Sequence, residues 1–108
     1  MINSKEFEFW LLNKNNETTG IGLSKSSAYK YSRAINSISK DMIKWGIIKE
    51  NLYNITSLYD LMENIDLIKG NEYFIRKNIK GHNMYSVALD HYLDFIHVTI
   101  LKPLNNQE

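Results

Sequence analysis

The sequence predicts an all-α protein, an orthogonal bundle of about five helices, from three observations. Apolar residues recur every three or four positions in several segments, which is the spacing of one face of an α-helix. Serine or asparagine residues that can cap a helix precede most of these segments. No segment shows the strict alternation of apolar and polar residues that predicts a half-buried strand. We expect one domain over residues 1–100, followed by a polar tail over 101–108.

The composition excludes several classes of protein. The 108 residues include no cysteine, so disulfides, thiol catalysis, zinc fingers and iron–sulfur clusters are excluded. No apolar run approaches the roughly 18–20 residues that a membrane span needs, and the first residues lack the apolar core of a signal peptide. We therefore expect a cytoplasmic protein without membrane contact.

The first helix is expected from Ser4 to about Asn13. Ser4 can cap this helix, and two glutamates near its start suit the positive end of the helix dipole. Its apolar face consists of Phe7, Trp10 and Leu11. The next segment, 15–22, contains two glycines and no helical periodicity, so we expect it to form a loop.

The second helix carries two opposed stripes of residues. It begins near Ser24 or Ser26 and ends at Gly46, a residue type that is common just past the last turn of a helix. One stripe is apolar and consists of Ala28, Tyr31, Ile35, Ile38, Met42 and Trp45. The other stripe is mainly cationic, lies about 200° around the helix, and consists of Lys30, Arg33, Ser37, Lys40 and Lys44. Such a helix docks on a core with one face and offers charge to a polyanion with the other.

Two shorter helices are expected after an apolar link over 47–55. Ser57 caps the third helix, and Asp60 three positions later resembles the acid of a capping box. The buried stripe of this helix is expected to consist of Leu58, Leu61, Met62 and Ile65. After a break at 68–71, Asn71 caps a fourth helix, which carries Tyr73, Phe74 and Ile79.

The last helix follows a turn at 80–83 and is expected from Met84 to about Ile100, before Pro103. Its inward residues are Tyr85, Leu89, Tyr92, Leu93, Ile96 and Ile100. Aromatic residues make up 12% of the chain, and most of them fall on predicted inner faces, so we interpret them as core residues rather than as base-stacking residues. Tyr29, beside the cationic stripe, is the exception.

The net charge of +1 hides an uneven distribution of charge. Ten of the thirteen cations lie in two blocks, 25–49 and 69–80, on either side of an acidic segment, 50–66. A basic surface is therefore compatible with the small net charge. Eleven of the cations are lysine, which neutralises phosphate as a point charge, whereas arginine is the usual reader of guanine. If the chain binds DNA, we expect contacts with the backbone to dominate.

The two basic blocks indicate double-stranded DNA as the partner. The expected DNA-binding residues are Ser26, Tyr29, Lys30, Arg33, Lys40, Lys44, Arg76, Lys77, Lys80 and His82. On its own, the cationic stripe of the second helix is equally compatible with an ordinary solvated face.

Signals for catalysis and for cofactors are weak. The GIG segment at 20–22 lacks the third glycine and the preceding strand of a nucleotide-binding motif. His91 and Asp94 share a helix with Asp90 and His97, but a metal site needs three or four converging ligands, so ordinary histidines are the simpler interpretation. We therefore expect no catalytic residue, no metal and no cofactor.

The order of the segments resembles that of known DNA-binding modules. GLSKS (22–26) leads into a long helix with Tyr31 inside, LYNITSLYD (52–60) enters a capped helix, and GHNMYSVAL (81–89) leads to HYLDFI (91–96). This order resembles the helical N-terminal DNA-binding module of restriction-type nucleases of the HNH or Mrr-like kind. It is also similar to the SAM-like core-binding domain of phage integrases (tyrosine recombinases), although Ser26 and Ser27 stand where that pattern prefers threonine.

The resemblance covers roughly residues 7–96 and implies a SAM-like fold with a non-catalytic DNA-binding function. The resemblance to integrase modules also implies that phosphates meet the second helix on one side, and the second basic block with the backbone amides after Gly81 on the other. Both families need a catalytic domain beside this module, so the resemblance implies a nuclease or recombinase activity located elsewhere. The alternative is a protein-interaction or oligomerisation domain, either a mobile-element regulator or an inhibitor of a host enzyme. The acidic segment 50–66 is compatible with that alternative, and the sequence does not predict the oligomeric state.

Overall fold

The computed structural model describes the backbone of residues 4–13 and 23–105, and the side chains of 4–13 and 23–99. Within these residues the chain forms five α-helices, one 3-10 helix and no strand, which confirms the all-α class. The elements are α1 (Ser4–Asn13), α2 (Lys25–Lys44), η1 (Leu52–Asn54), α3 (Leu58–Lys69), α4 (Glu72–Lys80) and α5 (Met84–Asn105). The loop predicted over 15–22 lies outside the described residues.

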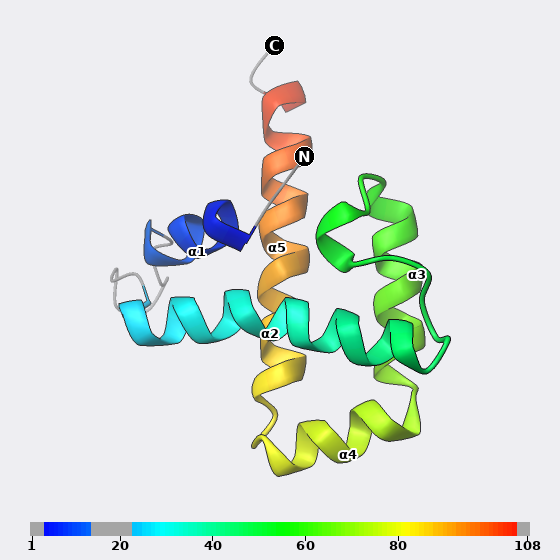
Figure 1. The fold of residues 1–108 in the computed structure, drawn as a ribbon. Coiled ribbons are helices and arrows are strands. Elements are labelled where there is room, and N and C mark those ends of the chain that lie inside the picture. The colour runs from blue at the N-terminus through cyan, green and yellow to red at the C-terminus, as the bar shows by residue number, and fades with distance from the viewer. Residues whose placement is uncertain (1–3, 14–22, 106–108) are drawn as a thin grey trace.

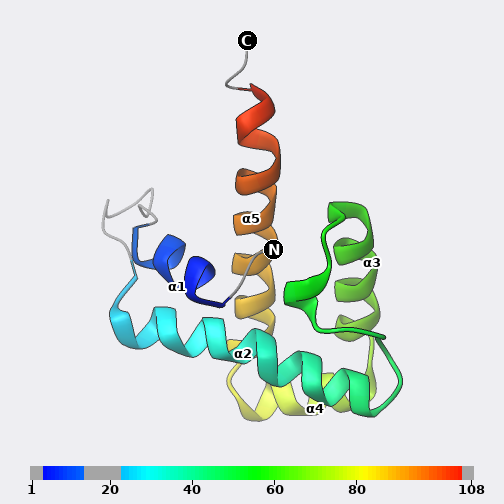
Figure 2. The ribbon, with the colours of Figure 1, turned by 45° about the horizontal axis from the view of Figure 1, so that its top comes forward.

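The bundle is built around the crossing of α2 and α5. Figure 1 shows α2 passing across α5, with α1 and α3 on opposite sides of α5 and α4 near the start of α5. The second view agrees with this arrangement and shows that the C-terminal end of α5 extends beyond the other helices (Figure 2). The faces of α2 and α5 that meet at the crossing therefore supply much of the core.

The core on the α1 side is aromatic. Phe7 of α1 lies edge-on to Tyr92 of α5, with ring centroids 5.1 Å apart, and its ring is 5.4 Å from that of Phe95. The ring centroids of Trp10 and Phe95 are also 5.4 Å apart. Tyr53 from η1 packs edge-to-face on Tyr92. Offset and edge-to-face rings of this kind add to the stabilisation from apolar burial.

Helix α2 begins and ends where the sequence predicts. The Ser24 side chain accepts a hydrogen bond from the Ser27 amide at 3.1 Å, and Gly46 follows the helix with a φ of +74°, a conformation that favours glycine. The buried apolar residues of its predicted stripe are Ala28, Ile35, Ile38 and Met42. The prediction that Trp45 is also buried was wrong: Trp45 follows the last helical residue and is 49% exposed.

The predicted caps of α3 and α4 are confirmed. The Ser57 hydroxyl accepts a hydrogen bond from the Asp60 amide at 3.3 Å. The Asn71 side chain accepts hydrogen bonds from the amides of Tyr73 and Phe74 in α4. One core residue of α3 was predicted wrongly, because Met62 is 50% exposed. Ile68, expected in the break after the helix, is instead fully buried, since α3 continues to Lys69 and places Ile68 about one turn after Ile65 and about two turns after Leu61.

The link between α2 and α3 packs on the core as predicted, and it contains the unpredicted turn η1. The buried Ser39 hydroxyl accepts from the Leu52 amide at 3.0 Å and donates to the Ile35 carbonyl at 2.8 Å. Asn51 donates to the Asn36 side chain at 3.0 Å. Polar groups of α2 thus hold a non-helical segment whose own backbone lacks regular partners.

Helix α5 continues past its predicted end at Ile100 and includes Pro103. Proline removes one backbone donor, which is why the helix was expected to stop before it. The helix ends two residues later, so the missing donor affects only its last turns. The buried inward residues of α5 are Ala88, Leu89, Tyr92, Phe95 and Ile96.

Candidate nucleic-acid interface

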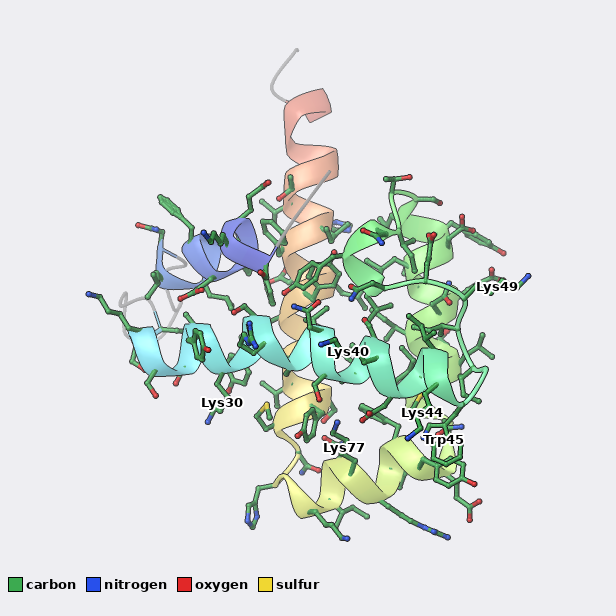
Figure 3. The ribbon with its side chains drawn as sticks, viewed as in Figure 1. Lys30, Lys40, Lys44, Trp45, Lys49 and Lys77 are labelled. Carbon is green, nitrogen blue, oxygen red and sulfur yellow. The ribbon has the colours of Figure 1, made fainter. Side chains whose placement is uncertain are left out.

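The cations of α2 lie on its outer, solvent-facing side. Lys30, Arg33, Lys40 and Lys44 are all exposed, and Figure 3 shows the three lysines spread along the helix. No carboxylate among the described residues forms an ion pair with any of the four. Their charge is therefore directed to solvent over the length of the helix.

The structure brings the second basic block, on α4, against this side of α2. Lys77 of α4 donates to the Ser37 hydroxyl at 2.8 Å and forms an ion pair with Asp41, and its side chain lies between the two helices in Figure 3. Beyond this contact, Tyr73 stacks on Trp45 at the end of α2. We call the cations of these two adjoining helices the basic face; they are Lys30, Arg33, Lys40, Lys44, Arg76, Lys77 and Lys80.

The cations of α4 differ in how far their charge is already neutralised. Lys77 pairs with Asp41, and its ammonium group lies 4.7 Å from the ring centroid of Tyr85. Arg76 forms an exposed pair with Glu72 in its own helix at 3.3 Å, which is weak in solvent. Lys80 has no ion pair with a described carboxylate. Arg76 and Lys80 can thus reach a phosphate, whereas Lys77 mainly joins α4 to α2.

Aromatic rings lie beside each of three α2 cations. The Arg33 guanidinium is 5.8 Å from the Tyr29 ring centroid, Lys30 is 5.9 Å from that of Tyr31, and Lys44 is 5.8 Å from that of Trp45. At exposed sites such contacts contribute about 0.5–1 kcal/mol. Of these rings Tyr29 is the most exposed, at 55%, so its hydroxyl can donate to a phosphate or sugar beside Arg33.

Ser26 lies at the start of α2 and His82 lies just after the end of α4. Ser26 is exposed in the first turn of α2, one turn before Lys30. His82 is exposed in the turn after α4, where its φ is +54°. The first three amides after Gly81, which were expected to contact phosphates, already have partners: those of His82, Asn83 and Met84 donate to the carbonyl groups of Ile79, Asn78 and Gly81.

Two features of the surface were missed in the sequence. Trp45 was counted as a core residue, although it directly precedes Gly46, a signal that it lies at the helix end rather than within the apolar stripe. Tyr73 was placed on the fourth helix without a role. Tyr73 also lines a hollow of about 460 Å³ together with Arg76, Lys77, Lys80, Gly81 and Tyr85. Lys49, which belongs to the first basic block, points away from the basic face (Figure 3).

The histidines do not form a metal site with the described acids. Within the described residues, no group of three or more histidine, aspartate or glutamate side chains has a metal-binding arrangement. The His91 ring instead lies 5.1 Å from that of Tyr31. Among the described helices, none combines the length and apolar character of a membrane span.

No family model, no curated protein and no solved structure matches this chain. The resemblance to restriction-type nuclease modules and to integrase core-binding domains therefore rests on the sequence motifs alone.

Proposed function

We propose that this chain is a non-catalytic DNA-binding module that contacts the duplex mainly through its phosphates. The observation that carries the proposal is the joining of two basic blocks, distant in sequence, into one face by the contacts of Lys77 with Ser37 and Asp41. Five cations of this face have no ion pair with a described carboxylate, namely Lys30, Arg33, Lys40, Lys44 and Lys80. Spaced charges on rigid helices match a polyanion better than they match a compact ligand.

The chemistry of the basic face favours backbone contacts over base reading. Arg33 is the only arginine that α2 contributes, and lysine carries no planar fork for guanine. With about five phosphates neutralised, the logarithm of the affinity should fall with the logarithm of salt concentration with a slope of about −4.5. Together with the resemblance, this supports a module that positions a nuclease or recombinase activity located elsewhere.

Charge reversal on α2 tests the proposal. We expect Lys30→Glu with Arg33→Glu to weaken binding to a labelled duplex at low salt at least tenfold and to reduce the salt slope by about 2. Lys49→Glu is the control for position, because Lys49 is exposed and points away from the basic face, and Lys30→Glu alone is compared with it at equal net charge. Equal affinity of the double variant and the Lys49 control, or only millimolar binding by the unaltered chain, would contradict the proposal.

The alternative, a protein-interaction domain, is supported by the outer face of α3. Tyr59 and Met62 are 71% and 50% exposed there, next to the exposed acids Glu63 and Asp66. An apolar patch with an acidic border suits a basic protein partner or a second copy of the chain. Light scattering after size exclusion separates the two functions, since a stable dimer that is indifferent to DNA favours the alternative.

A further inference from the structure

Trp45 and Tyr73 form a stacked pair of aromatic rings at the edge of the basic face. Their ring centroids are 4.5 Å apart and their planes differ by 6°. Each side chain is nevertheless 49% exposed, so each ring covers part of the other while the rest of the pair faces solvent. Large exposed aromatic surfaces mark places where a further ring or a partner is bound.

The backbone that carries the two rings is fixed by hydrogen bonds at helix ends, and the rings stack on each other. The Trp45 amide donates to the Asp41 carbonyl at 3.1 Å, which ends α2. The Tyr73 amide donates to the Asn71 side chain at 3.0 Å, which begins α4. Because the pair is positioned in the free protein, the binding of a stacked ligand loses little side-chain conformational entropy.

Positive charge surrounds the pair. The Lys44 ammonium group lies 5.8 Å from the Trp45 ring centroid. On the other side, Tyr73 borders the hollow that Arg76 and Lys80 also line. The charge complementarity therefore favours a ligand that combines a flat ring with phosphates, which is the chemistry of a nucleotide.

We propose that Trp45 and Tyr73 are a stacking platform for an unpaired nucleobase of a DNA strand whose phosphates contact Lys44 and Arg76. Bases inside a duplex stack on one another and do not reach a surface platform, so the ligand is a single-stranded extension that adjoins the duplex. The inference rests on the proposed function, and it adds the class of DNA substrate. Stacking on aromatic side chains tolerates any base.

The test compares a blunt duplex with the same duplex carrying a single-stranded thymidine extension. We expect the unaltered chain to bind the extended DNA about tenfold more tightly, the effect of one stacked base. Trp45→Ala and Tyr73→Ala should each abolish this preference while the affinity for the blunt duplex changes little. Tyr59→Ala is the matched control, because Tyr59 is the most exposed tyrosine on α3 and lies outside the basic face.

Fluorescence gives a second measurement that does not depend on removing the platform. In a Trp10→Phe variant Trp45 is the only tryptophan of the chain, and base stacking should quench its emission on addition of the extended DNA and not of the blunt duplex. Equal affinity for the two DNAs overturns the inference but leaves the proposed function standing. Failure to bind either DNA overturns both, and a dimer that Trp45→Ala dissociates overturns the inference in favour of a protein contact.

Discussion

Tyr53 joins the link between α2 and α3 to the core through both its ring and its hydroxyl group. The hydroxyl donates to the Ser32 carbonyl at 2.7 Å, and the ring lies edge-on to Tyr92 with centroids 5.2 Å apart. Burial raises the pKa of both tyrosines, and for Tyr53 the neighbouring Tyr92 adds to this effect. Both phenols are therefore neutral donors in the folded chain over the ordinary pH range.

Replacing Tyr53 by phenylalanine removes the hydroxyl and keeps the ring. We expect the free energy of unfolding at neutral pH to fall by about 1 kcal/mol, the net value of one hydrogen bond. Urea unfolding followed by circular dichroism measures it. Tyr59→Phe is the control, since Tyr59 is 71% exposed, and an equal loss in both variants would contradict the assigned bond.

We also expect the stability of Tyr53→Phe to differ from that of the unaltered chain in its response to alkaline pH. The pKa of Tyr53 in the folded chain is raised above the unfolded value of about 10. The stability that Tyr53 contributes is therefore complete below about pH 10, and it is lost as the pH rises from there through the folded pKa. Above about pH 10, the free energy of unfolding should therefore fall more with rising pH in the unaltered chain than in Tyr53→Phe. Parallel declines of the two chains with pH would show that Tyr53 ionises equally in both states.

At the scale of the helices, the sequence predicts where a helix starts better than it predicts burial. The caps at Ser57 and Asn71 were predicted correctly and Ser24 was one of two candidates, because a cap bonds to amides two or three residues away and needs no distant partner. The burial of Trp45 and Met62 was predicted wrongly, because helical spacing defines a face but not how far the neighbouring helices cover it. The turn η1 depends on the Ser39 hydroxyl, thirteen residues away, which no local pattern reveals.

Helix α4 is short and depends on its cap. Asn71 accepts from the Tyr73 and Phe74 amides at 3.0 and 3.2 Å, and α4 spans only nine residues. We expect Asn71→Ala to lower the free energy of unfolding by about 1 kcal/mol, whereas Asn71→Asp, which keeps the acceptor, should change it little. Thermal unfolding of the two variants decides this, and a similar loss in both would show that the side chain does not act as a cap.

At the scale of the molecule, the two basic blocks could be read from the sequence, but their contact could not. Charge counting finds the two blocks, residues 25–49 and 69–80. The pairing of Lys77 with Asp41 joins positions 36 residues apart and follows only from the tertiary structure, in which α4 packs on α3 and α5 and lies beside α2. It changes the interpretation of Lys77, whose charge is already neutralised, while Arg76 and Lys80 remain directed to solvent.

Asp41 is the only acid that pairs with a cation between α2 and α4 in the described chain, and it lowers the charge of the basic face by one. Asp41→Asn keeps the shape of the side chain and releases Lys77 for a phosphate. We therefore expect tighter DNA binding at low salt and a salt slope steeper by about 0.9. Because both partners are partly exposed, the free energy of unfolding should fall by less than about 1 kcal/mol.

Asp90→Asn is the matched control for this prediction, because it breaks the exposed pair of Asp90 with Lys69 at 2.6 Å, whose cation is not part of the basic face. Both variants raise the net charge of the chain by one, so any effect of net charge alone is shared. Anisotropy titrations of a labelled duplex over a series of salt concentrations should show the steeper slope for Asp41→Asn only. The same slope in both variants would mean that DNA responds to the overall charge and not to Lys77, and the basic face would then end at α2.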